Sequence, residues 1–241
     1  MAIHRLQELQ GITRHGDGGL RLGALASHAD IAGSDAVLAG FTALADASAI
    51  VGSHATRAQG TVGGNLMNAS PAMDTGGPLL CFGATLTLQS PAGSRTIALD
   101  DLWTGPSTTS AAAGELLVAI ELPAPASGTG SAYLRLEYRR QMEIAVVGAT
   151  AVVTLADGAI TDARIAMTAL SPTIRRVPEA EAALIGGNGD AAAIEAAGAA
   201  VAAAASPISD VRGSAAYRTA MAAVITRRAV ETALSRARKE S

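Results

Sequence analysis

The sequence has one cysteine, one lysine and very few aromatic residues. Among its 241 residues, Cys81 is the only cysteine, Lys239 is the only lysine, and aromatic side chains make up 2%. A single cysteine excludes an internal disulfide and any iron–sulfur or zinc site built from four cysteines of this chain. The only lysine lies close to the C-terminal end and follows no glycine-rich loop, so a P-loop nucleotide site is excluded as well.

Other common catalytic patterns are also missing. The chain has no G-x-G-x-x-G dinucleotide fingerprint and no G-x-S-x-G nucleophile elbow. Its four histidines lie in the first quarter without the spacing of metal ligands, so we predict no metal site; they are His4, His15, His28 and His54. Cys81 stands in the apolar run 79–82, which favours a buried, unreactive thiol.

Charge and hydropathy exclude two further classes. The formal net charge is -3 and the pI is about 5.8, so no basic field favours nucleic acid. No apolar run approaches the roughly 18 residues that a membrane span needs. The N-terminus lacks the apolar stretch of a signal peptide. With 49% hydrophobic residues, we expect a cytoplasmic protein with a large core.

The pattern along the first half mixes strands and helices. Short strands are predicted near 20–25, at 84–89, at 95–99 and at 116–122. Ser27 with Asp30 three residues later indicates a helix start, and residues 35–50 are apolar at helical spacing. Between them and the next strand lies a glycine-rich segment, 52–77, with no assigned element. Residues 123–130 contain two prolines and two glycines and mark a candidate domain boundary.

The second half predicts a hairpin covered by helices. Asp157-Gly158 separates the β-rich runs 146–155 and 160–170, which is a strong hairpin pattern. Helices are predicted from Pro178 to Gly186-Gly187, over the alanine-rich stretch 191–205, and from 217 to 238. The predicted fold class is α+β, with domains at 1–125 and 131–241.

Residues 57–74 are the most informative stretch. Gly63 and Gly64 offer a bare backbone that could turn several N–H groups toward one anion. Thr61 and Asn65 add short polar side chains, and Asp74 could accept hydrogen bonds from sugar-like hydroxyls. From the two glycines alone, a plain turn between two elements is the more common explanation.

The complete string resembles the FAD-binding (medium) subunit of molybdenum hydroxylases, the xanthine dehydrogenase and aerobic carbon monoxide dehydrogenase family. Its T-x-G-G-N and N-x-S-P-x-x-D patterns stand here at 61–65 and 68–74. The resemblance extends over the chain, through residues 115–123 and 135–140 to the stretch 210–218. It implies a PCMH-type FAD-binding domain followed by a C-terminal domain with an antiparallel sheet and helices.

The resemblance also implies site residues. Thr61, Val62, Gly63, Gly64 and Asn65 would hold the FAD diphosphate, and Asp74 would contact the ribityl and diphosphate region. Leu117 would line the flavin ring and Arg135 would lie near it. Val51 stands where some relatives have an aromatic residue, which would weaken ring packing. No catalytic side chain and no metal ligand are implied.

One part of the family pattern is missing. Relatives begin with a βαβ lobe whose A-G-G-T-like loop also grips the FAD phosphates. Only 60 residues precede Thr61, and they resemble the segment after that lobe. We therefore expect that the N-terminal lobe is missing, that only the second lobe of the FAD domain is present in 1–125, and that the diphosphate is held less tightly.

The function implied is electron transfer within a complex. A partner with a molybdenum cofactor would oxidise the substrate, and electrons would pass through [2Fe–2S] clusters on a small subunit to FAD here, then to an acceptor. A non-flavin scaffold subunit, favoured by the missing lobe, is the alternative, and a nonfunctional fragment is a weaker one.

Overall fold

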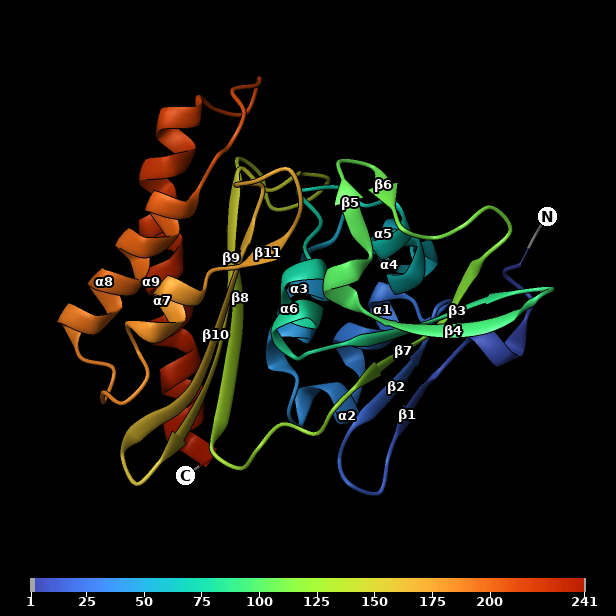
Figure 1. The fold of residues 1–241 in the computed structure, drawn as a ribbon, viewed down its shortest axis with the longest axis horizontal. Helices are drawn as coiled ribbons and strands as arrows, with labels where there is room; N and C mark the ends of the chain where they lie inside the picture. The colour runs from blue at the N-terminus through green and yellow to red at the C-terminus, as the bar shows by residue number, and fades with distance from the viewer. Residues whose placement is uncertain (1–2, 241) are drawn as a thin grey trace.

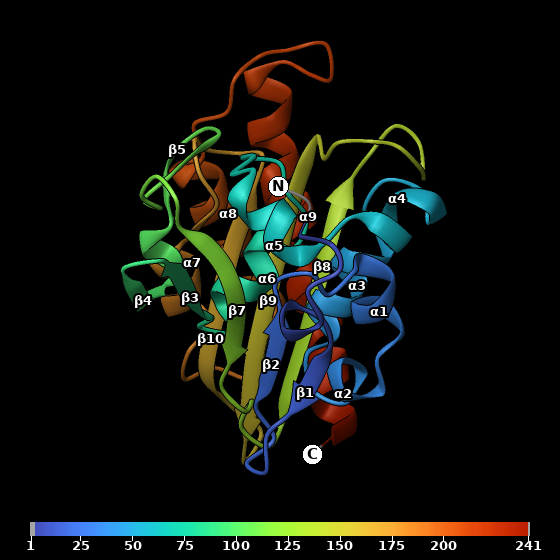
Figure 2. The ribbon, with the colours of Figure 1, turned by 90° about the vertical axis from the view of Figure 1, so that its right-hand side faces the viewer.

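Two antiparallel sheets lie on either side of a layer of short helices, and longer helices cover the outer face of the second sheet (Figures 1 and 2). The computed structural model describes residues 3–240. The first sheet has the order β1 (Ile12–Arg14), β2 (Leu20–Gly23), β7 (Leu116–Leu122), β3 (Thr85–Ser90), β4 (Gly93–Ala98). The second has the order β11 (Arg175–Arg176), β10 (Ala159–Thr168), β9 (Val147–Ala156), β8 (Thr129–Leu136).

Helices fill the space between the sheets and cover the outside of the second. The inner layer comprises α1 (His28–Gly33), α2 (Asp35–Leu38), α3 (Thr42–Ile50), α4 (His54–Gln59), α5 (Val62–Met67) and α6 (Gly76–Cys81). The outer layer comprises α7 (Pro178–Ala182), α8 (Ala191–Ala204) and α9 (Ala215–Glu240). Minor elements are η1 (Gln7–Leu9), η2 (Leu99–Asp101), β5 (Trp103–Gly105) and β6 (Thr108–Thr109).

Each sheet has its own core. The first core joins the inner helices to the first sheet and includes Phe41 and Phe82, whose rings meet edge to face with centroids 4.8 Å apart. It also takes in Tyr133 and Val152 from the inner face of the second sheet. The second core lies between the second sheet and α7–α9 and is built mainly from Ala, Val, Leu and Ile. The predicted α+β class is confirmed.

Local sequence rules predict several elements correctly. Ser27 caps α1 in a capping box: its hydroxyl accepts a hydrogen bond from the Asp30 N–H, and the Asp30 carboxylate accepts one from the Ser27 N–H. Asp157 and Gly158 both have positive φ, 51° and 78°, as a two-residue hairpin turn between β9 and β10 requires. The strands at 84–89 and 116–122 and the helices at 191–205 and 217–238 are also confirmed within a few residues.

Two expectations were wrong. The helix expected over 35–50 is interrupted, because α2 ends at Leu38 and α3 begins at Thr42. Gly40 favours helix poorly, and the intervening Phe41 leaves helical geometry at φ -122° and ψ 43° while its ring is buried. The segment 52–77, for which no element is predicted, contains α4, α5 and the start of α6. Side-chain caps start two of them, since Ser53 accepts from the Thr56 N–H and Thr61 accepts from the Gly64 N–H.

Candidate functional site

The segment from Val51 to Asp74, called the motif segment below, lies in the inner helical layer. It includes α4 and α5. The start of α5 is fixed to the chain that follows β2, because the Val62 N–H donates to the Ala26 carbonyl at 3.0 Å and the Gly63 N–H donates to the Ala24 carbonyl at 2.9 Å. The motif segment is therefore positioned by the first sheet through α5.

The backbone N–H groups at the start of α5 already have partners. Besides those of Val62 and Gly63, the Gly64 N–H donates to the Thr61 hydroxyl at 3.1 Å and the Asn65 N–H to the Thr61 carbonyl at 3.0 Å. This corrects the expectation of a bare loop turning several N–H groups toward an anion. The segment is instead a capped helical turn. The positive ends of its peptide dipoles still point out of its N-terminal end.

A side chain would have different consequences at the two adjacent glycines. A Cβ on Gly63 would lie 2.6 Å from the Ala24 carbonyl oxygen, so only glycine allows α5 to approach that strand end. A Cβ on Gly64 would approach only the Thr61 hydroxyl, at 3.0 Å, and Gly64 is exposed. At Gly64 the outer face of this turn therefore carries no side chain, and a larger residue would occupy that space. The space lies beside the positive end of the turn, which fits a diphosphate.

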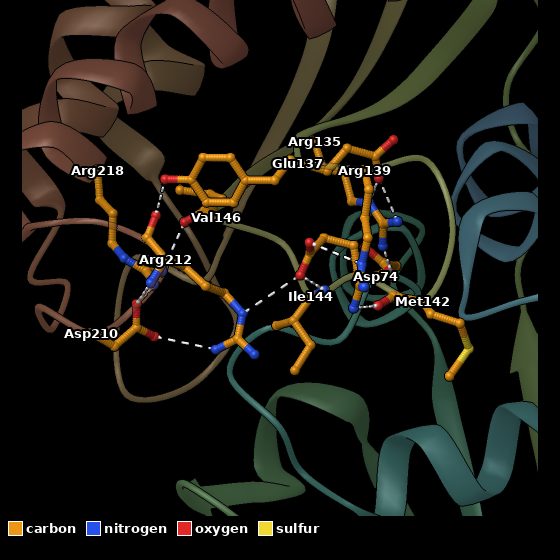
Figure 3. A network of polar contacts seen from close by, with 12 residues as sticks. Asp74, Arg135, Glu137, Arg139, Met142, Ile144, Val146, Asp210, Arg212 and Arg218 are labelled. Carbon is orange, nitrogen blue, oxygen red and sulfur yellow. Dashed lines mark hydrogen bonds and ion pairs between the residues drawn. The ribbon is translucent and has the colours of Figure 1, made fainter.

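Asp74, at the other end of the motif segment, is 7% exposed. Its carboxylate accepts a hydrogen bond from the Tyr133 hydroxyl at 2.7 Å and one from the Arg135 guanidinium at 2.8 Å. Burial raises the pKa of Asp74, and the Arg135 charge and the Tyr133 hydroxyl oppose that rise. Asp74, Tyr133 and Arg135 are called the buried cluster below, which joins the motif segment to β8. Figure 3 shows two of its members, Asp74 and Arg135.

Arg135 binds three acceptors with one guanidinium. Besides Asp74, its Nε donates to the Glu137 carboxylate at 2.6 Å and its other terminal nitrogen donates to the Ile50 carbonyl at 3.1 Å. Burial opposes the charge, but Asp74 and Glu137 outweigh it and raise the pKa of Arg135. The Arg135 side chain is 1% exposed, so it is enclosed by protein.

The remaining predicted site residues lie in different surroundings. Leu117 is 6% exposed and belongs to the first core, where it is paired with Leu88 across β7 and β3. The Asn65 amide oxygen accepts a hydrogen bond from the Thr75 hydroxyl at 2.7 Å, and Asn65 is partly exposed. The structure thus brings Thr61, Gly64 and Asn65 together at one partly exposed turn and keeps Leu117 inside the protein.

The loop between β8 and β9 also contacts the motif segment. The Met142 N–H donates to the Gly52 carbonyl at 2.9 Å, and Figure 2 shows this loop reaching across to α4. Tyr138 in the same loop donates its hydroxyl to the Arg212 carbonyl at 2.6 Å. The stretch 210–218 is fixed in turn by Arg218, which binds the Val146 carbonyl and Asp210 (Figure 3). The sequence reasoning missed Tyr133 and Met142, for which no local pattern exists.

Two other predictions concern Cys81 and metal ligands. Cys81 is fully buried and burial raises the pKa of its thiol, as expected of an unreactive cysteine. Within residues 3–240, no group of three or more His, Cys, Asp or Glu side chains is arranged to hold a metal ion. In the same range, no helix has the length and apolar character needed to cross a membrane.

Comparison with known proteins identifies the family. Residues 1–125 match the family model described as the FAD binding domain in molybdopterin dehydrogenase, and residues 131–233 match the CO dehydrogenase flavoprotein C-terminal domain. The chain belongs to the FAD-binding subunits of the molybdenum hydroxylases. Its cofactor is FAD, and it is an oxidoreductase component whose role is electron transfer.

Individual relatives support this assignment over nearly the whole chain. The carbon monoxide dehydrogenase medium chain of Afipia carboxidovorans is 36% identical over 98% of this chain and 81% of its own length. The xanthine dehydrogenase FAD-binding subunit of Escherichia coli is 32% identical over 74% of this chain and 62% of its own. A solved structure of carbon monoxide dehydrogenase from Hydrogenophaga pseudoflava matches with a TM-score of 0.92 at 34% identity, covering 96% of this chain and 80% of that one.

Proposed function

We propose that this chain holds FAD against the exposed first turn of α5. Thr61, Gly64 and Asn65 face outward there and contact the diphosphate, while Val62 and Gly63 shape the turn from beneath through their bonds to the strand end. Asp74 and Arg135 support the site from inside the protein through the ion pair between them, whose two side chains have little exposed surface. Leu117 contributes to the core of the first sheet. FAD supplies the two-electron redox chemistry, and the chain binds and orients it.

Gly64 carries this proposal, because no side chain covers the turn there and a larger residue would occupy that space. The test is Gly64→Val, with Gly33→Val as the matched control. Gly33 is also exposed and also in a short helix, and no atom lies within 4 Å of the point where its Cβ would be. FAD is titrated into each protein and followed by the change in flavin fluorescence, with circular dichroism as the check of folding.

We expect Gly64→Val to fold and to lose most of its FAD affinity, and Gly33→Val to bind FAD like the parent chain. Equal affinity in both variants, at matched circular dichroism, would remove the α5 turn from the site.

The proposed partners follow from the same role. A chain with one cysteine cannot ligate a [2Fe–2S] cluster with four cysteines, so its electrons come from another subunit. We place it in a complex with an iron–sulfur small subunit and a molybdenum-containing large subunit.

The partner proposal is tested by co-expression. The three chains should co-purify, and the complex should reduce a dye in the presence of substrate only when FAD is bound. A complex that assembles but passes no electrons through flavin would favour a scaffold role instead. A chain that stays alone under these conditions would contradict both roles.

A further inference from the structure

Arg135 contacts both ends of the motif segment. One terminal nitrogen donates to the Ile50 carbonyl, one residue before the segment begins, and the other donates to Asp74, its last residue. These two acceptors are separated by 24 positions in sequence but share one planar side chain. A single guanidinium from β8 therefore holds together two points of the chain that flank the FAD motif, Ile50 and Asp74. Figure 3 shows Arg135 beside Asp74.

Further hydrogen bonds from β8 and the loop after it also hold the two ends of the motif segment. The Tyr133 hydroxyl binds the second oxygen of Asp74, and the Met142 N–H binds the Gly52 carbonyl near the start of the segment. Glu137 accepts from the Arg135 Nε and so fixes the orientation of the guanidinium plane. All of these groups lie on β8 or in the loop that follows it, in the part of the chain that matches the C-terminal family domain.

The first part of the segment has little packing of its own, because helix α4 has no buried residue. Helix α5 is packed better, since Val62 and Leu66 lie in the first core, while Gly64 and Asn68 are exposed in or beside it. Segments with few buried side chains open locally at low free energy unless their ends are held. The contacts from β8 are therefore well placed to set how rigid the motif segment is.

We infer that Arg135 is a positioning residue for FAD: it acts through the motif segment, by joining Ile50 to Asp74, and does not itself touch the flavin. The 1% exposure of its side chain leaves no surface for a ring to contact. Lysine cannot replace it, because one ammonium lacks the planar fork that reaches Ile50, Asp74 and Glu137 together. This inference rests on the proposed FAD site, but its structural half can be tested without FAD.

The experiment compares Arg135→Met and Arg135→Lys with Arg236→Met in the full chain. Arg236 on α9 is the matched control, because its guanidinium also joins the two halves of the molecule, binding Asp46 on α3 and the Ser131 carbonyl on β8. Both of these acceptors lie outside the motif segment. Amide hydrogen exchange is followed peptide by peptide without FAD, and FAD affinity is measured in parallel.

Both Arg135 variants should speed exchange across residues 51–74 and weaken FAD binding, each by about tenfold or more, as expected for losing hydrogen bonds to a charged group. Arg236→Met should change exchange in 51–74 and FAD affinity much less than the Arg135 variants do, because none of its acceptors lies in the segment and Asp46 keeps the Tyr133 N–H as a partner. Thermal unfolding measured for all three variants separates these local effects from a general loss of stability. If Arg135→Met does not fold, the comparison is made with Arg135→Lys, which keeps the positive charge.

Unchanged exchange in 51–74, or equal increases in the Arg135 and Arg236 variants, would overturn the inference. Faster exchange with unchanged FAD affinity would overturn the positioning role while leaving the proposed FAD site standing. A parent chain that binds no FAD would instead contradict the proposed function, and the exchange result would still decide whether Arg135 holds the segment.

Discussion

The two ends of the motif are built in opposite ways. At the first turn of α5, Thr61, Gly64 and Asn65 are partly or fully exposed, and no side chain covers the turn at Gly64. At the other end, Asp74 is enclosed with Tyr133 and Arg135, and its oxygens bind protein. In the proposed site, one continuous string of sequence thus serves two purposes: its exposed end contacts the cofactor, and its buried end holds that exposed end in place.

The largest loss of folding stability is expected when Asp74, in the buried cluster, loses its carboxylate. Asp74→Ala leaves the Arg135 charge enclosed with one carboxylate fewer and the Tyr133 hydroxyl without its partner. Removing one partner of a buried ion pair costs about 3–5 kcal/mol. Urea unfolding of the full chain should show a loss of that size. Asp30→Ala, at the exposed N3 position of the α1 capping box, provides the comparison and should cost only about 1 kcal/mol.

The next effect concerns His28, whose backbone N–H donates to the Gly60 carbonyl of the motif segment. His28 is 2% exposed. Burial first, and the Arg57 charge second, lower the pKa of His28 to about 4. Because the unfolded chain takes up a proton near pH 6.5 and the folded chain only near pH 4, the stability contribution is complete above pH 6.5 and falls as the pH drops toward 4.

His28→Gln should remove this pH dependence. In the parent chain, the free energy of unfolding should fall by up to about 3 kcal/mol between roughly pH 6.5 and pH 4. The measurement is the urea midpoint of the parent and of the variant at several pH values across that range, and the pH dependence of the two midpoints is compared. An identical slope in the two proteins would show that His28 does not titrate differently on folding.

These expectations also show what the sequence could and could not predict. Ser27 with Asp30, and Asp157 with Gly158, are local patterns whose partners lie within three residues, so they are predicted correctly. The pairing of Asp74 with Tyr133 and Arg135 spans about 60 residues and depends on how the second sheet packs on α6. No periodicity encodes that contact. The family resemblance supplies Asp74 and Arg135 as candidates, but not their contact with each other.

The motif itself is predicted as a glycine loop because glycine is a poor helix former. The structure shows that Gly63 is required by the close approach to Ala24, and that the Thr61 cap starts a helix in spite of the two glycines. The spacing of Ser53 to Thr56 and Thr61 to Gly64 was the available indication of these helices.

A moderate effect is expected from the hydroxyl in the buried cluster. Tyr133→Phe removes one hydrogen bond to Asp74 but keeps the ring in the first core, so we expect a loss of about 1–3 kcal/mol. Arg135 still holds Asp74 in this variant, and FAD affinity should change less than in Arg135→Met. Urea unfolding and FAD titration on the same samples measure stability and FAD affinity. A larger loss of FAD affinity in Tyr133→Phe than in Arg135→Met would show that Tyr133, and not Arg135, is the more important residue for FAD binding.

The smallest effect on stability is expected at the exposed end. Thr61→Ala removes the cap of α5 and should cost about 1 kcal/mol, because α5 remains bound to Ala24 and Ala26. Its effect on FAD affinity should nevertheless exceed that of Tyr133→Phe, since the Thr61 hydroxyl belongs to the face that we propose contacts the diphosphate. Thr61→Ser restores the hydroxyl and should recover both quantities.

The central claim is that FAD meets the α5 turn while the buried cluster supports the turn from within. Amide hydrogen exchange of the full chain with and without FAD tests it most directly. We predict that FAD slows exchange in peptides covering residues 61–68 and leaves the β8 strand around Tyr133 and Arg135 unchanged. Protection on β8 with none at residues 61–68 would contradict the account.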